Sequence, residues 1–352
     1  MKTEATEKEI FMRRCIELAL AGQGSVAPNP LVGCVVVHKG RIIGEGYHKQ
    51  YGKNHAEVEA IQSVQNQLLL RESSLYVNLE PCSHIGKTPP CTNFILRHNI
   101  PEVIIGQVDI FPEVSGRGIK QLSDAGCRVK VGILENECAW LNRRFITFYE
   151  KKRPYIILKW AQSADGYIDI ERTATTPTGP AWINDSTDLI TVHKWRSEEQ
   201  AIMAGTQTII NDNPKLTTRL YPGVNPIRIT IDKHLRLKPA LNIFDNSAPT
   251  IIFTEKQAQS KGNISFITID FSADIIPQVL KHLYLLNIQS LIVEGGRKLL
   301  DSFICSGFWD EARIMTGQQK LNYGLPAPVL NCKTDSYIDL HSCRLRICKN
   351  CG

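Results

Sequence analysis

The segment Asn54–Glu59 has the sequence NHAEVE, Glu80–Cys82 has the sequence EPC, and a further cysteine stands at position 91. One imidazole and two thiolates suit zinc as ligands and leave its fourth tetrahedral position open to water. We therefore predict that His55, Cys82 and Cys91 bind Zn²⁺. Bound zinc would lower the pKa of that water to about 7.

Glu57 follows the histidine by two residues, at the first turn of an expected helix. From there its carboxylate can face the water without binding the metal, so we predict that Glu57 is the catalytic proton carrier. A lone histidine or cysteine is more often a packed residue, and a structural zinc site takes four protein ligands. The joint His-x-Glu and Pro-Cys pattern is instead the signature of zinc deaminases of nucleobases. That signature has two residues between the cysteines, whereas eight separate Cys82 from Cys91.

Composition limits the class of protein. A chain of 352 residues with 43% hydrophobic and 22% charged residues is long enough for two globular domains. The N-terminus lacks the apolar core of a signal peptide, and no apolar run reaches the roughly 20 residues of a membrane helix. We therefore expect a cytoplasmic protein with its eleven cysteines reduced. The net charge of +6 suits small anionic substrates better than duplex DNA.

Short apolar runs alternate with helical spacing along the whole chain, which predicts α/β structure in two domains, residues 1–150 and 154–352. Residues 38–40 are typical of a hairpin turn, and residues 149–154, charged and ended by proline, are typical of a linker. In the first domain we expect helices on both faces of a sheet. Strands are expected at 32–37, 41–44, 74–79, 103–106, 128–133, 155–160, 200–204, 227–231, 250–253 and 290–293, and helices at 55–65, 92–98, 119–125, 186–196, 275–286 and 297–306, with a loop at 171–180.

The segment between the two cysteines is specific. Pro81–Cys91 (PCSHIGKTPPC), with Ala27–Gly33 (APNPLVG) and Gly44–His48 (GEGYH), resembles three motifs of the riboflavin-biosynthesis deaminase family. The resemblance spans nearly the whole chain. It implies a cytidine-deaminase-like three-layer domain followed by a dihydrofolate-reductase-like α/β domain. It also implies a bifunctional enzyme that deaminates a phosphorylated ribosylamino-diaminopyrimidine and then reduces the ribosyl group to ribityl with NADPH.

The same resemblance implies substrate contacts in the deaminase half at Asn29, His48, His84 and Lys87. His84 and Lys87 can offer donors to a sugar or phosphate, for which lysine serves as a point charge. Taken alone, Asn29 and His48 are equally compatible with turn chemistry. Asp109 and Gly116–Gly118 follow later strands and are candidates for the rim of this pocket.

In the second half, no G-x-G-x-x-G follows the first strand, but Val293–Arg297 (VEGGR) ends a strand and opens a helix, where backbone can approach a phosphate. Lys159 with Ser163–Gly166 resembles the opening motif of the family's reductase half. Taken singly, these residues could be core, surface charge or turn. Pro180 replaces a small hydroxyl residue usual in the family, and residues 173–178 resemble an added loop. The resemblance implies NADPH contacts at Ala161, Trp182, Thr208, Asp212 and Gly296, and substrate contacts at Lys159, Arg196, Leu216, Arg219 and Glu294.

Two other functions are weighed against this one. The first is a deaminase of another base or nucleotide whose reductase-like half is not catalytic. The second is a tRNA-editing or RNA-binding module, which needs a basic face with exposed aromatics; aromatic residues are only 7% and basic residues are scattered. We expect a small phosphorylated pyrimidine as the partner, no nucleic acid and no membrane, with a homo-oligomer left open. Cys343, Cys348 and Cys351 are interpreted as incidental, because three thiols at a terminus do not close a four-ligand shell.

Overall fold

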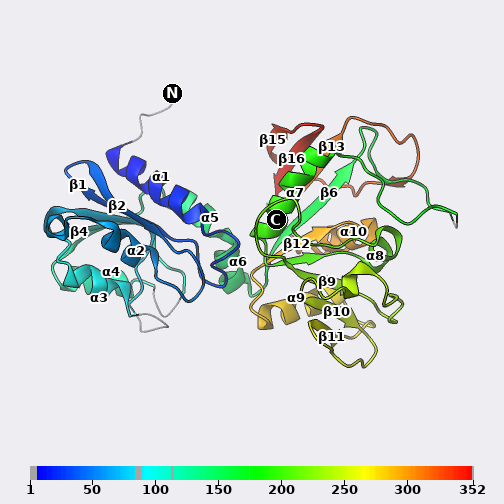
Figure 1. The fold of residues 1–352 in the computed structure, drawn as a ribbon, viewed down its shortest axis with the longest axis horizontal. Coiled ribbons are helices and arrows are strands. Elements are labelled where there is room, and N and C mark those ends of the chain that lie inside the picture. The colour runs from blue at the N-terminus through cyan, green and yellow to red at the C-terminus, as the bar shows by residue number, and fades with distance from the viewer. Residues whose placement is uncertain (1–5, 84–88, 112–114, 174, 351–352) are drawn as a thin grey trace. The chain divides into compact units, whose positions relative to one another are not determined.

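The computed structural model describes residues 6–83, 89–111, 115–173 and 175–350 (Figure 1). His84, Lys87 and Cys351 lie outside the described residues. The chain divides into two compact units, Met1–Lys151 and Lys152–Gly352. Each unit has its own sheet and its own hydrophobic core.

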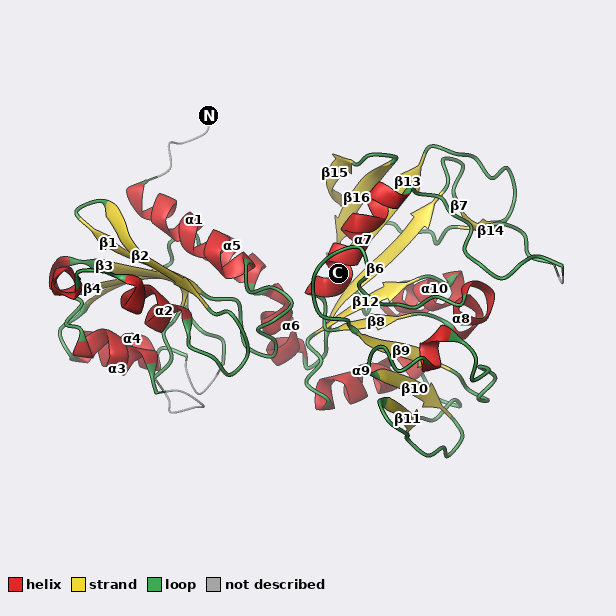
Figure 2. Ribbon diagram, viewed as in Figure 1, coloured by secondary structure: helices red, strands yellow, loops and turns green. Residues whose placement is uncertain are grey.

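The first unit is a five-stranded sheet of order β2-β1-β3-β4-β5 with helices on both faces, as predicted (Figure 2). β1 is antiparallel to β2 and β3, whereas β3, β4 and β5 run parallel. The strands are β1 (Gly33–His38), β2 (Arg41–Tyr47), β3 (Ser74–Leu79), β4 (Glu102–Gln107) and β5 (Arg128–Val131); the helices are α1 (Glu7–Leu20), α2 (Ala56–Ser63), the 3₁₀ turn η1 (Gln67–Glu72), α3 (Cys91–Arg97), α4 (Arg117–Asp124), α5 (Glu135–Leu141) and α6 (Arg143–Lys151).

Alternation along the central strands explains the three layers. Cys34 and Val36 of β1 pack with α2, α3 and α4, while Val35 and Val37 face α1 and α5. Neighbouring strand residues point to opposite faces, so a strand covered on both sides has apolar residues at every position. β1 and β3 are accordingly buried along almost their whole length.

The second unit contains a nine-stranded sheet of order β11-β10-β9-β8-β12-β6-β13-β16-β15, parallel from β11 to β13 and antiparallel at β16 and β15. Helices α9 and α10 pack on one face, and α7 and α8 on the other. The elements are β6 (Tyr155–Gln162), β7 (Tyr167–Asp169), α7 (Ser186–Glu198), β8 (Ala201–Met203), α8 (Thr206–Asp212), β9 (Ile227–Ile231), η2 (Asn242–Phe244), β10 (Thr250–Thr254), β11 (Ile264–Thr268), α9 (Ile275–Leu285), β12 (Ser290–Glu294), α10 (Arg297–Ser306), β13 (Glu311–Gly317), β14 (Leu325–Pro326), β15 (Thr334–Asp339) and β16 (Cys343–Lys349).

The predicted linker at residues 149–154 differs from the structure, and the two described C-terminal cysteines lie apart. The linker prediction at 149–154 is wrong for its first half, because α6 continues to Lys151, with Tyr149 packed against Phe145 and Phe148. Cys343 and Cys348 are both buried in β16 but belong to cores on opposite faces of the sheet, so they share no site. Among the described residues, no helix is both long enough and apolar enough to cross a membrane.

Candidate active sites

Three predicted zinc ligands come together at one end of the first sheet. His55 is the N-cap of α2, Cys82 follows β3, and Cys91 is the first residue of α3. His55 Nδ1 lies 3.5 Å from Cys82 Sγ and 3.3 Å from Cys91 Sγ. Zn–S bonds of about 2.3 Å and Zn–N bonds of about 2.0 Å at tetrahedral angles separate such atoms by roughly 3.5 Å. The donor set and its spacing therefore fit zinc.

The surroundings of Cys82 lower the pKa of its thiol and so favour the thiolate. A hydrogen bond with the Cys91 side chain, followed by one with His55, lowers the pKa of Cys82 to about 4, against the opposing effect of burial. The backbone N–H of Cys91 also donates to Cys82 Sγ at 3.4 Å. Because metal binding requires a thiolate, these hydrogen bonds favour the ligand form of Cys82.

Glu57 lies beside these ligands, and one of its carboxylate oxygens makes no hydrogen bond with the described residues. The side chain is 3% exposed, and its Oε2 atom has no hydrogen-bond partner among the described residues. Burial raises the pKa of Glu57 to about 7. A buried carboxylate oxygen without a partner is costly, so its place at the floor of a cavity points to a bound group that would pair with it.

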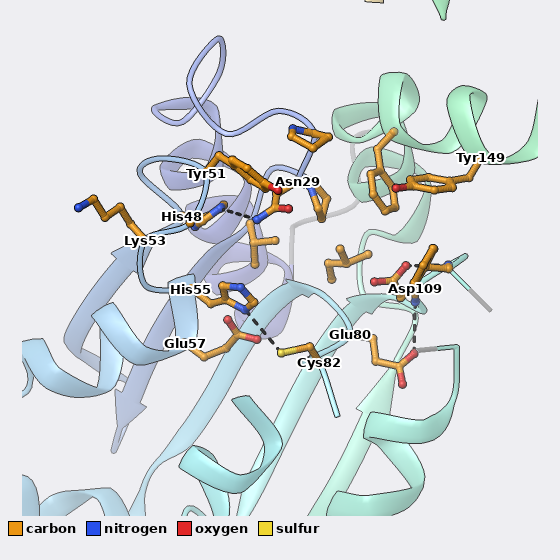
Figure 3. A pocket seen from close by; sticks show the side chains of 17 residues that line it. Asn29, His48, Tyr51, Lys53, His55, Glu57, Glu80, Cys82, Asp109 and Tyr149 are labelled. Atoms are coloured by element: carbon orange, nitrogen blue, oxygen red, sulfur yellow. Dashed lines mark hydrogen bonds between the residues drawn. The ribbon is translucent and has the colours of Figure 1, made fainter. Parts of the chain in front are cut away.

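That cavity has a volume of about 350 Å³, and His55, Glu57 and Cys82 form its floor (Figure 3). One wall carries Asn29 and His48, whose Nδ2 and Nε2 atoms are 3.0 Å apart. His48 Nδ1 lies 2.9 Å from the carbonyl oxygen of Asn54, so this nitrogen is the donor. Burial lowers the pKa of His48, and the neutral ring then accepts a hydrogen bond from the Asn29 amide at Nε2.

The facing wall was largely missed by sequence reasoning. Asp109, a candidate, lines it with Phe111, Phe145 and Tyr149. The Tyr149 ring lies 5.2 Å from that of Phe111 and 4.8 Å from that of Phe145. Phe145 and Tyr149 are four residues apart on α6, a spacing that places them on one helix face and that could have revealed the pair.

Glu80 positions this wall relative to the metal ligands and was also missed. Its carboxylate accepts four backbone N–H groups, from Asp109 at 3.2 Å, Gly116 at 2.9 Å, Gly118 at 2.9 Å and Ile119 at 3.2 Å. A Cβ atom on Gly118 would lie 2.2 Å from the carbonyl oxygen of Pro81, so only glycine allows α4 to approach the Pro81–Cys82 segment this closely. The segment that carries Cys82 is therefore fixed to the start of α4.

In the second unit, Lys159 and Glu294 occupy neighbouring register positions on the adjacent strands β6 and β12. Arg196 of α7 binds Glu294 through two of its three guanidinium nitrogens, Nε to Oε1 at 3.0 Å and Nη2 to Oε2 at 2.6 Å. Burial would raise the pKa of Glu294, but Arg196 and Lys159 outweigh it and lower the value to about 2. Burial lowers the pKa of Lys159, an effect that Glu294 opposes.

Leu216 and Arg219 adjoin this pair. Arg196 Nη1 donates to the Thr217 carbonyl oxygen at 3.3 Å, and Arg219 Nη1 donates to Thr217 Oγ1 at 3.1 Å. Burial, and then the charge of Arg196, lowers the pKa of Arg219. In this part of the described structure Lys159, Arg196 and Arg219 meet a single carboxylate, Glu294, so the excess positive charge favours an anionic ligand.

Two of the five residues assigned to NADPH lie together. Gly296 is the N-cap of α10 and makes no side-chain cap, and a Cβ atom there would lie 2.8 Å from Thr208 Oγ1. Glycine at this position therefore allows Thr208 to approach the start of α10, a helix N-terminus without a side-chain cap, and such termini favour phosphate. Ala161 lies on β6, opposite Met315.

The other two cofactor candidates are placed differently. Trp182 is 62% exposed, so it is not a core residue, and Gln319 donates to its carbonyl oxygen. Asp212 accepts a 2.8 Å hydrogen bond from Arg172, a residue of the predicted 171–180 loop. Burial raises the pKa of Asp212 to about 6. Among the described residues, the hydrogen bonds of Trp182 and Asp212 run to Gln319 and Arg172 and not to Gly296.

Both halves of the chain are similar in sequence to known proteins. Residues 5–107 match the family model described as the cytidine and deoxycytidylate deaminase zinc-binding region, and residues 154–317 match the RibD C-terminal domain. The riboflavin biosynthesis protein RibD of Aquifex aeolicus is 38% identical over 323 residues, which cover 90% of this chain and 88% of that protein. The chain belongs to the RibD family.

Further RibD comparisons agree. RibD of Bacillus amyloliquefaciens is 40% identical over 86% of this chain and 82% of its own length. A solved structure from Thermotoga maritima, titled as a diaminohydroxyphosphoribosylaminopyrimidine deaminase and 5-amino-6-(5-phosphoribosylamino)uracil reductase, superposes with a TM-score of 0.89 at 36% identity, covering 98% of this chain and 99% of that one.

Membership of the RibD family confirms the predicted family, fold class and enzyme class. The chain is a bifunctional deaminase and reductase of riboflavin biosynthesis, and its cofactors are Zn²⁺ and NADPH. The roles of the individual site residues are predictions, and they are proposed below from the geometry of each site.

Proposed function

We propose that the first unit deaminates the phosphorylated ribosylamino-diaminopyrimidine and that the second unit reduces the ribosyl group of its product to ribityl with NADPH. One observation supports the proposal most directly. His55, Cys82 and Cys91 converge within 4.8 Å beside the partnerless oxygen of Glu57, at the floor of a cavity large enough for a substituted ring. On this proposal the partner is a small phosphorylated pyrimidine, and nucleic acid is not a substrate.

In the deaminase, His55, Cys82 and Cys91 would hold the metal. When bound, Zn²⁺ supplies a water whose pKa is lowered to about 7. Glu57 Oε2 would accept one proton of the water and pass it to the ring nitrogen, and would then carry the second proton to the amino group, which leaves as ammonia. Asn29, fixed by the neutral His48 ring, orients the ring from one wall. The overall step exchanges an amino group and a water for a carbonyl group and ammonia.

In the reductase, Arg196 and Arg219 bind the phosphate, because planar guanidinium groups match its oxygens. Lys159, held beside Glu294, donates a hydrogen bond to the sugar near the reacting carbon. Thr208 and Gly296, with Ala161, Trp182 and Asp212, would hold NADPH. Bound NADPH supplies the hydride, and the protein supplies position and charge.

Product identification tests the proposal. Zinc-loaded protein is given the diaminopyrimidine phosphate with and without NADPH, and ammonia, nicotinamide absorbance and sugar product are measured. We expect ammonia in both samples, and loss of nicotinamide absorbance with a ribityl product only where NADPH is present. Ammonia without NADPH oxidation would support the alternative with a non-catalytic second half, and no ammonia would overturn the substrate assignment.

Arg196→Ala is expected to raise the KM of the reductase for its substrate, lowering kcat/KM by about 100-fold, since a buried charge-assisted contact is lost. Arg196→Lys keeps the positive charge but loses the planar group that binds Glu294 through two nitrogens. Its kcat/KM should therefore lie between those of the unsubstituted enzyme and Arg196→Ala. Steady-state NADPH oxidation measures both variants. Ammonia release, made by the other unit, should stay at the unsubstituted rate; loss of both activities would indicate a folding defect instead.

A further inference from the structure

His193 links two segments of the proposed reductase substrate site. It lies on α7 three residues before Arg196, a spacing that places both side chains on one helix face. The His193 side chain is 3% exposed, and its Nδ1 atom accepts the backbone N–H of Arg219 at 2.8 Å. Arg196 holds the same segment through the Thr217 carbonyl oxygen at 3.3 Å. Two side chains of one helix thus fix residues 217–219.

The hydrogen bond defines the state of the ring. Because a backbone N–H can only donate, Nδ1 of His193 carries no proton and the neutral ring carries its proton on Nε2. Burial, and then the charges of Arg196 and Arg219, lowers the pKa of His193 to about 4. The acceptor at Nδ1 therefore persists at neutral pH, and the ring adds no positive charge to the site.

The segment needs such an anchor. Leu216 is buried with a φ of 52°, in the left-handed region that a branched residue adopts only when its surroundings enforce it. Arg219 is held near Arg196, and each guanidinium raises the free energy of the other. Both guanidinium groups also donate to Thr217, so anchoring the Arg219 backbone keeps the two cations near each other despite their repulsion.

We propose that His193 is a positioning residue of the reductase, which holds the Arg219 backbone so that Arg219 and Arg196 reach the same anionic group of the substrate. This inference rests on the proposed function, in which these arginines bind the phosphate. His193 touches neither substrate nor cofactor in this assignment; it acts through Arg219.

Three substitutions of His193 distinguish the hydrogen bond accepted by Nδ1 from the packing of the side chain. In His193→Asn, the amide oxygen occupies the place of Nδ1 and can accept the same N–H. His193→Gln places its amide near Nε2, and His193→Leu has no acceptor. We expect His193→Leu and His193→Gln to raise the KM for the deaminated substrate about tenfold, as for a lost hydrogen bond that orients a charged group, with kcat and the KM for NADPH changed less. His193→Asn should stay within about threefold of the unsubstituted enzyme.

Ammonia release by the same chain is the internal control and should be unchanged in all three variants. Equal KM values for His193→Asn and His193→Gln would overturn the positioning role, even where the leucine variant folds poorly. Arg219→Ala distinguishes the underlying proposal. If Arg219→Ala leaves the substrate KM unchanged, the phosphate assignment is wrong; if it raises the KM while His193→Leu does not, only the inference about His193 fails.

Discussion

Glu57→Gln is expected to slow ammonia release by about 10²–10⁴-fold while the protein keeps its zinc. The substitution preserves the shape of a side chain that is 3% exposed and leaves His55, Cys82 and Cys91 untouched. An amide cannot take up the proton that the Oε2 atom is placed to receive. Ammonia assay and metal analysis of the same preparation measure the two expected results.

The matched control is Glu17→Gln on α1, which removes the same charge from an exposed carboxylate paired with Arg14. It should leave ammonia release unchanged. Full activity in Glu57→Gln would remove Glu57 as the proton carrier. Loss of zinc from that variant would instead assign Glu57 to maintenance of the metal site.

Cys91→Ala is expected to release zinc and abolish ammonia release, while NADPH oxidation with the deaminated substrate continues. Two remaining protein ligands do not make a stable zinc site, and the reductase residues lie in the other compact unit. Metal analysis, ammonia assay and NADPH oxidation measure the three results. Adding zinc should not restore ammonia release in this variant, whereas it should restore the unsubstituted enzyme after chelation.

Cys127→Ala is the control for this experiment, since Cys127 is a buried free thiol of the same unit whose described contacts do not include the metal ligands. It should retain zinc and ammonia release. A Cys91→Ala protein that still held zinc and released ammonia would show that the third ligand has been misassigned.

Much of the fold could be predicted because local pattern and final structure agree. Strand β3 begins and ends where the apolar run at 74–79 does, and α10 matches the predicted helix at 297–306. The helix α1 was missed although its start carries a capping box, with Thr6 and Glu9 each bonded to the other's backbone. Strand β16 was missed although residues 343–347 alternate apolar and charged side chains, the pattern of a strand with one exposed face. Strand β15 was missed because its residues are mostly polar.

Some site residues could be predicted from the sequence and others could not. The metal ligands belong to short sequence motifs, so their chemistry can be predicted without knowledge of the fold. The aromatic wall joins Phe111, after β4, to Phe145 and Tyr149 on α6, and only the fold makes them neighbours. Likewise, sequence could not show that Asp212 is paired with Arg172, because the two residues are forty positions apart.

The Glu80 contacts have a consequence for how the enzyme can diverge. All four hydrogen bonds run to main-chain N–H groups, so the anchoring does not depend on which side chains residues 109 and 119 carry. Gly118 is restricted by its contact with Pro81, and Gly116 by its φ of 73°. Mutations in the segment that supplies Asp109 can therefore change the surface offered to a substrate while the cysteine-bearing strand end keeps its place. A deaminase built this way can acquire new ring preferences without having to rebuild its metal centre.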